Sequence, residues 1–220
     1  MFSIQAFKQT YETEEVSLSI RDKQFSFFIP KDLDPFINQA DVLHHFPLWA
    51  KIWEASLVLA DYLAGQNQSS KKILELGAGL GAIGIIAASF GHNVTLTEYD
   101  PHALQFIQAN AHINSCDTID IKLLDWHDPK LDGKFDMIVG SELIYKDSDF
   151  SPLVALFHKY LSDEGEIFLA NEPRKASKPF LDMMVQWYTI QVWRKQLRAK
   201  DEKKTILLTR LTEKNKKVVQ

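Results

Sequence analysis

The chain has 220 residues, of which 45% are hydrophobic and 25% charged, and its formal net charge is −4. These values are typical of one globular domain and exclude two ordinary domains. The single cysteine, Cys116, excludes internal disulfides and cysteine-built zinc sites, and we expect no metal. No basic, apolar leader opens the chain, and no apolar run is long enough to span a bilayer. We therefore expect a cytoplasmic protein without membrane contact.

Positive charge is concentrated at the C-terminal end of the chain. Residues 194–220 contain ten Lys and Arg against three acidic residues, a net charge of +7 that leaves −11 for the remainder. The simplest interpretation is a solvated hairpin with a basic end. A patch that attracts an acidic partner or nucleic acid is the alternative. Because no RNA-binding aromatic motif accompanies the charges, we do not expect nucleic acid as a partner.

The first 63 residues predict a hairpin, a linker and a helix. Apolar and polar side chains alternate within residues 11–30 on both sides of a turn, which predicts a β-hairpin. Apolar residues then recur at helical spacing across 46–63, which predicts a helix carrying Trp49 and Trp53.

From residue 72 onward, strand and helix patterns alternate. Strands are predicted at 72–76, 93–97, 119–124, 135–139, 166–170, 188–194 and 205–211, and helices at 81–90, 101–113, 152–161 and 179–186. This alternation predicts a doubly wound, Rossmann-like α/β fold whose mostly parallel sheet is covered by helices on both faces. We assign residues 1–45 to an N-terminal β-hairpin and linker extension, and 46–220 to this domain. Ligands are expected at the carboxyl ends of its strands.

The first strand of this alternation leads into the glycine-rich sequence GAGLGA, and Glu98 follows about 20 residues later, which fits NAD or another adenosine-containing cofactor. Glu75 stands two positions before Gly77, where a carboxylate would repel a pyrophosphate and favour a cation. We therefore favour S-adenosylmethionine (SAM), which has an ammonium, a sulfonium and no phosphate. Gly77, Ala78 and Gly79 would approach it closely, and Glu98 would accept hydrogen bonds from its ribose. Glycines that serve packing alone are the remaining alternative.

Polar and aromatic residues also end the neighbouring strands. Asp125 could accept a hydrogen bond from the adenine amino group, and Trp126 could stack on the ring, although a tryptophan in this place also suits a core or a rim. Tyr99 and Ser141 end two further strands and complete the predicted cofactor site. NAD enzymes normally add a substrate domain, and no residues remain here for one.

These segments carry a family resemblance. The chain resembles class I, seven-strand SAM-dependent methyltransferases in ELGAGLG, LTEYDP, LLDW and its terminal strand hairpin. It is more closely similar to methyltransferase family 16, protein-lysine methyltransferases and bacterial relatives, in FPLWAKIWEASLVLADYL and FDMIVGSELIY. The resemblance covers about residues 46–170. Its glycine motif is common to all class I enzymes, whereas the W-x-[DEP]-[AS] and [DE]-x-x-[YF] motifs are more specific.

The resemblance implies a seven-stranded sheet in the order 3-2-1-4-5-7-6, with the last strand pair antiparallel. It also implies that Trp53 borders the cofactor, that Glu98 holds its ribose and that Trp126 lies at its adenine. Glu142 and Tyr145 would line the channel of the methyl acceptor. We assign Glu142 to orienting an acceptor amine, and Tyr145 to shaping the channel or taking a proton.

The first hypothesis is therefore a SAM-dependent N-methyltransferase that modifies a lysine of a protein, and we expect it to be a monomer. Methylation of a small amine or other metabolite is the alternative, followed by a SAM-binding module without turnover and an NAD oxidoreductase. The sequence lacks [DN]-P-P-[YF], the motif of enzymes that act on planar amides, which weighs against DNA adenine or glutamine acceptors.

Overall fold

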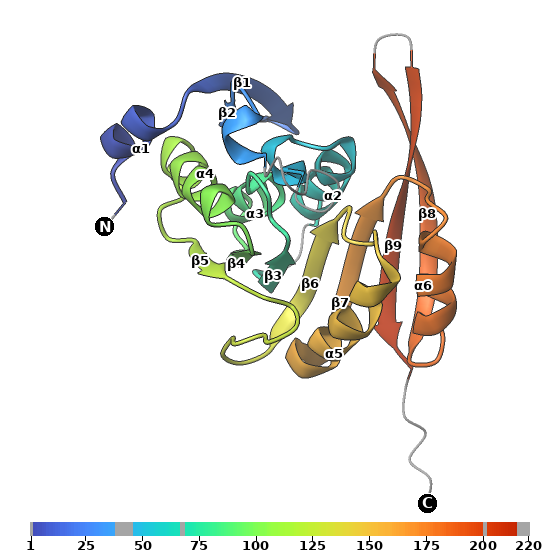
Figure 1. Cartoon of the computed structure of the whole chain (residues 1–220). Coiled ribbons are helices and arrows are strands. Elements are labelled where there is room, and N and C mark those ends of the chain that lie inside the picture. The colour runs from blue at the N-terminus through green and yellow to red at the C-terminus, as the bar shows by residue number, and fades with distance from the viewer. Residues whose placement is uncertain (1, 38–45, 67–68, 200–201, 215–220) are drawn as a thin grey trace, which may run out of the picture.

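The structure, a computed structural model, describes residues 2–37, 46–66, 69–199 and 202–214. A seven-stranded sheet contains β3 (Lys72–Leu76), β4 (Asn93–Glu98), β5 (Asp120–Leu123), β6 (Phe135–Ser141), β7 (Leu161–Asn171), β8 (Tyr188–Ala199) and β9 (Glu202–Glu213). Its order is β5-β4-β3-β6-β7-β9-β8, with β9 antiparallel to both of its neighbours and the other pairs parallel. This is the predicted order, and the doubly wound α/β fold is confirmed (Figure 1).

Helices cover both faces of the sheet. Successive residues of a strand face opposite sides, and both sets of side chains are apolar in the central strands, so each face needs a cover. The helices are α2 (Glu54–Ala64), α3 (Ala82–Ser89), α4 (Pro101–Ile113), α5 (Phe150–Tyr160) and α6 (Ser177–Met184). Ile73 of β3 packs in the cluster that contains α2, α3 and part of α4, whereas its neighbour Leu74 packs in the cluster of α5 and α6. No helix in the described ranges is both long and apolar enough to cross a membrane.

The predicted helix across 46–63 is wrong in its first half. A short 3-10 turn (Leu48–Ala50) and an extended stretch precede α2, which begins at Glu54. The indole N–H of Trp49 donates to Asp100 Oδ2 at 3.1 Å, and that of Trp53 donates to the Leu48 carbonyl at 2.8 Å. These tertiary and local hydrogen bonds hold the segment in an irregular path, although its apolar spacing suits a helix.

The N-terminal region forms α1 (Ile4–Thr10) and a hairpin of β1 (Thr13–Ile20) and β2 (Lys23–Pro30). The hairpin is as predicted, but α1 was not foreseen, since seven residues give little periodicity. Its Phe7 packs edge-on against Phe106 of α4, with ring centroids 5.0 Å apart. A further 3-10 turn follows at Asp34–Phe36. The boundary placed after residue 45 adjoins residues 38–45, which lie outside the described ranges, so the domain division stays a prediction.

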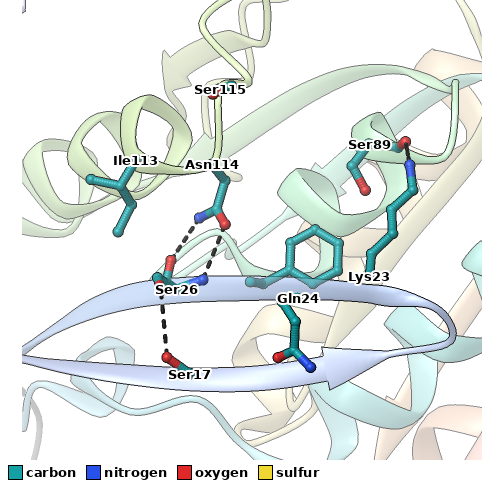
Figure 2. Close-up of a pocket in the computed structure, with 9 residues that line it drawn as sticks. Ser17, Lys23, Gln24, Ser26, Ser89, Ile113, Asn114 and Ser115 are labelled. Atoms are coloured by element: carbon teal, nitrogen blue, oxygen red, sulfur yellow. Dashed lines mark hydrogen bonds between the residues drawn. The ribbon is translucent and has the colours of Figure 1, made fainter.

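Two asparagines fasten this hairpin to the domain, Asn110 in α4 and Asn114 directly after that helix. Asn110 is fully buried, accepts from Phe28 N at 2.7 Å, and donates to the carbonyls of Phe28 and Leu80. Asn114 accepts from Ser26 N and donates to Ser26 O (Figure 2). A cavity of about 500 Å³ lies beside this contact and is lined by none of the predicted site residues.

Replacing Asn110 with alanine is expected to lower the free energy of unfolding by about 3 kcal/mol, because three buried backbone groups lose their partner. Urea unfolding would measure this loss. Gln105→Ala, at an exposed position of the same helix, is the control and should change stability little. Equal stability of the two variants would show that the hairpin is not fastened by Asn110.

The β8–β9 hairpin extends past the carboxyl end of β7. Asn171, the last residue of β7, pairs with Leu207 of β9, so the part of β9 before Leu207 rises beyond the sheet edge (Figure 1). Lys204 in that part lies 2.6 Å from Glu54 Oε1 at the start of α2 and 3.8 Å from Glu172 Oε1. The hairpin therefore forms one wall at the edge where ligands are expected.

Candidate cofactor and acceptor site

The loop between β3 and α3 requires its glycines. Gly77 and Gly79 have φ of +59° and +58°, in the left-handed region that L side chains rarely adopt. A methyl group on Gly77 would lie 2.9 Å from Leu143 Cδ2 and 3.6 Å from Trp126 Cζ2, and one on Gly79 would lie 3.3 Å from the Trp49 carbonyl. Leu143, Trp126 and Trp49 therefore lie so close to the two glycines that neither position has room for a side chain, and the Trp126 indole lies beside the loop.

Glu98 binds this loop. Its Oε2 accepts from Gly79 N at 2.8 Å, and its Oε1 accepts from Tyr99 N and Asp100 N at 2.7 and 3.3 Å. Burial raises the pKa of this carboxyl, while the three N–H donors oppose the rise. The Gly79 N–H is therefore already used by an acidic side chain, and a pyrophosphate approaching it would meet a carboxylate.

Glu75 lies beneath α3, away from the loop surface. It is 1% exposed, and a methyl group on Gly84 of α3 would come within 2.7 Å of its Oε2. Oε2 has no hydrogen-bond partner among the described residues. Burial raises the pKa of this carboxyl well above its ordinary value, and Glu98 adds to the rise. The repulsion of phosphate that we expected from Glu75 is therefore better supplied by Glu98.

The raised pKa of Glu75 gives a pH-dependent stability. The folded chain keeps this proton to higher pH than the unfolded chain, whose carboxyl titrates at 4.5. The stabilisation is therefore complete below that value and is lost as pH rises through the folded pKa. Glu75→Gln, which stays neutral, should increasingly exceed the wild type in Tm as pH rises from about 5 to about 9. A Tm difference independent of pH would contradict this, with exposed Glu14→Gln as the control.

The other predicted cofactor residues lie at the same edge with different surroundings. Ala78 is buried in the loop, and its N–H donates to Thr97 O at 3.0 Å. Asp125 accepts from the N–H of His127 at 2.8 Å, and Trp126, which follows it, packs against the apolar cluster of α5 and α6. Tyr99 is 66% exposed. The structure thus brings Ala78 and Trp126 to the loop and leaves the Tyr99 side chain in solvent.

Glu142 and Tyr145 share a partner at the end of β6. Glu142 has φ of +52°, and its side chain is 5% exposed. Its Oε1 accepts from Glu172 N at 2.7 Å, and its Oε2 accepts from Arg174 Nη2 at 2.6 Å. The same guanidinium lies 4.4 Å from the centre of the Tyr145 ring. We call Glu142, Tyr145 and Arg174 the acceptor cluster.

Burial sets the protonation of this cluster. It raises the pKa of the Glu142 carboxyl, against the opposing effects of Glu172 N–H and Arg174. It also raises the pKa of the Tyr145 phenol, which Arg174 again opposes. A phenol with a raised pKa stays protonated at neutral pH, so Tyr145 is better suited to shaping a channel than to taking a proton.

Leu143 connects the acceptor cluster to the glycine loop, since it follows Glu142 and a methyl group on Gly77 would meet its side chain.

The other two predicted cofactor residues, Ser141 and Trp53, lie near the start of α2. Ser141 Oγ lies 2.7 Å from Ser56 Oγ of α2. Trp53 directly precedes that helix. Its indole N–H donates to the Leu48 carbonyl, and Lys51 Nζ lies over its ring, 4.7 Å from the ring centre. Among the described residues, no group of three or more His, Cys, Asp or Glu could hold a metal ion.

Sequence reasoning missed Arg174, which follows β7. The rule that ligands meet strand ends applies equally to this strand, whose end reads NEPR, and would have drawn attention to it. It also missed Ser56 and the role of Trp49, whose indole reaches Asp100. No local sequence pattern predicts these contacts, because each joins residues that are far apart in the chain.

Known proteins show clear sequence similarity to this chain. A family model described as "Lysine methyltransferase" matches residues 47–187. The chain belongs to this family. It is similar to EEF1A lysine methyltransferase 3 of Mus musculus, 35% identical over 57% of this chain and 56% of that protein. It is also similar to protein N-lysine methyltransferase METTL21A of Xenopus tropicalis, 31% identical over 70% of this chain and 80% of that protein.

The solved structures support the fold of this lysine methyltransferase family member. Precorrin-6y C5,15-methyltransferase from Geobacter metallireducens superposes with a TM-score of 0.61 at 15% identity, covering 86% of this chain and 94% of that one. At that identity the likeness shows the fold alone. The first of the two relatives above is matched over little more than half of its own length, so substrates are a matter for proposal.

Proposed function

We propose that this chain transfers a methyl group from SAM to the side-chain nitrogen of a lysine in a protein. The observation that carries the proposal is the buried Glu142 carboxylate, which already holds a cation beside an aromatic ring. Leu143 places this cluster next to the glycine loop. Relatives named as protein-lysine methyltransferases support the choice of acceptor.

The residues of the loop fit SAM better than a dinucleotide. Gly77 and Gly79 put no side chain between the loop backbone and a ligand, and Glu98 keeps lone pairs with which its two oxygens can accept from ribose hydroxyls. The Trp126 indole, half-buried beside Gly77, offers a face for adenine. Asp125, at the same strand end, would accept from the adenine amino group. Ala78, Tyr99, Ser141 and Trp53 remain proposed members of this site.

SAM, when bound, supplies an electrophilic methyl group on a sulfonium. The chain's own residues would position the acceptor for in-line attack and exclude water. A lysine enters as an ammonium, with an ordinary pKa of about 10.4. Glu142 would hold that ammonium through Oε2, while Tyr145 and Leu143 surround its aliphatic stem. Desolvation lowers the pKa of the amine and raises that of the Glu142 carboxyl, so the ammonium can pass its proton to Glu142 and present a lone pair to the methyl carbon.

Two measurements test this proposal. Thermal-shift assays with SAM, its demethylated product and NAD should show stabilisation by the first two, and stabilisation by NAD alone would reject a methyltransferase. Methyl-labelled SAM should then be added with the purified protein to lysate of cells that lack it. Label in a protein band supports the proposal, whereas label confined to small molecules supports a metabolite acceptor. Binding without any transfer would indicate a SAM-binding module.

We further propose that the protein is a cytoplasmic monomer, with residues 46–220 as the catalytic domain and 1–45 as an extension. The lone cysteine, Cys116, is buried and free, as suits a reducing compartment. Gel filtration with light scattering would test the monomer.

A further inference from the structure

The acceptor cluster contains a cation of the chain itself. Arg174 Nη2 lies 2.6 Å from Glu142 Oε2, and the guanidinium carbon lies 4.4 Å from the centre of the Tyr145 ring. A charge-assisted hydrogen bond to a carboxylate, together with the face of an aromatic ring, is the environment that also binds an alkylammonium ion. The place that suits the acceptor ammonium is therefore filled by Arg174.

The two oxygens of Glu142 have separate tasks. Oε1 accepts from the backbone N–H of Glu172, which fixes the carboxylate to the end of β7. Oε2 accepts from the Arg174 side chain. Exchange of one cation for another at Oε2 would leave the Oε1 hydrogen bond, and thus the orientation of the carboxylate, unchanged.

The Arg174 side chain can move away from Glu142 into solvent. Its side chain is 35% exposed, whereas that of Glu142 is 5% exposed, so the guanidinium can move into solvent while the carboxylate cannot. The backbone of Arg174 stays fastened, because its N–H donates to Ser177 Oγ at the start of α6 at 3.3 Å. Only the side chain has to rotate. A partly exposed ion pair is weak enough for a second cation to replace it.

We propose that Arg174 occupies the acceptor-ammonium site of the free protein and that the lysine of the substrate displaces it. This inference rests on the proposed function, and it makes Arg174 a residue that sets specificity without touching the methyl group. A neutral side chain could not replace a guanidinium on a buried carboxylate, so the exchange selects for a cationic acceptor. It also keeps Glu142 paired between turnovers.

The sharpest test places a lysine at the site from within the chain. In Arg174→Lys the new ammonium should rest on Glu142 Oε2 and become a methyl acceptor when SAM is added. Mass spectrometry of peptides should find methylation at position 174 at a rate per molecule that does not depend on protein concentration. Lys175, the exposed next residue, is the internal control and should stay unmodified. Arg174→Lys/Glu142→Gln should lose the modification.

Wild-type protein, assayed in parallel on lysate, separates the two ideas. If the wild type labels a protein but Arg174→Lys does not methylate itself at 174, the inference is wrong and the proposed function stands. If the wild type labels nothing, the proposed function fails, and this inference fails with it. Equal modification of positions 174 and 175 would also overturn the inference, because it would show no defined ammonium site.

A second variant, Arg174→Met, tests displacement by one measurement that needs no turnover and by one kinetic measurement. With a methionine there, the pKa of the Tyr145 phenol should rise, because the nearby positive charge that lowers it is gone. Methylammonium chloride should reverse the rise, and sodium chloride at the same ionic strength should not. NMR of ¹³C-labelled tyrosine would follow it. KM for the labelled acceptor should fall about three- to tenfold. A higher KM, or no response to methylammonium, would contradict displacement.

Discussion

Glu142→Gln should lower kcat/KM for methyl transfer at least about 100-fold, because the amide cannot hold an ammonium or guide its proton away. The substitution keeps the size of the side chain, and its carbonyl can still accept from Glu172 N. What it removes is the charge that Arg174 contacts in the free protein. Steady-state kinetics with the labelled acceptor would measure the loss, while SAM affinity should remain close to that of the wild type.

A matched control separates this effect from loss of stability. Glu166→Gln also removes an ion pair of β7, with Arg210 of β9, but near the middle of that strand and away from its carboxyl end, where the acceptor cluster lies. We expect it to retain nearly full activity. Equal activity of Glu142→Gln and Glu166→Gln would show that Glu142 does not orient the acceptor.

The second large effect is expected at Glu98. Glu98→Ala removes the partner of three backbone N–H groups, including that of Gly79, and the proposed acceptor of the ribose hydroxyls. A buried N–H left without a partner costs about 1–3 kcal/mol, and the hydrogen bonds from Gly79 and Asp100 are part-buried. We expect SAM affinity to fall at least about 30-fold, equivalent to about 2 kcal/mol, together with a lower Tm. Isothermal titration with SAM would measure the change.

Two further variants test whether the loss of SAM affinity comes from the Glu98 carboxylate. Glu98→Gln keeps one accepting oxygen and should fall between Glu98→Ala and the wild type. Asp120→Ala, which removes an exposed ion pair with Lys122 on the neighbouring strand β5, should bind SAM normally. Wild-type affinity in Glu98→Ala would mean that the cofactor does not use this carboxylate.

The strands, helices and glycine loop could be predicted from the sequence because each depends on residues that are close together in the chain. The strand and helix periods, and the spacing from GAGLGA to Glu98, depend on residues close together in the chain. Trp49 shows the opposite case. Its apolar spacing is helical, but its indole N–H finds Asp100, 51 residues away, and the segment is not a helix.

Charge states were the least predictable property of the site. The sequence placed Glu75 in the right strand, but its proximity to Gly84 and its burial follow from packing against α3. Arg174 was missed because it meets Glu142 across 32 residues of chain. The surroundings of both residues are therefore set by tertiary packing and not by the neighbouring sequence.

The identity of the methylated residue tests the central claim most directly. Methyl-labelled SAM and the purified protein would be added to lysate of cells that lack it, and the labelled band would be hydrolysed to amino acids. We predict methyl-lysine with the wild type and at least about 100-fold less of it, at equal protein concentration and time, with Glu142→Gln. Label on histidine, on arginine or only in small molecules would contradict the account.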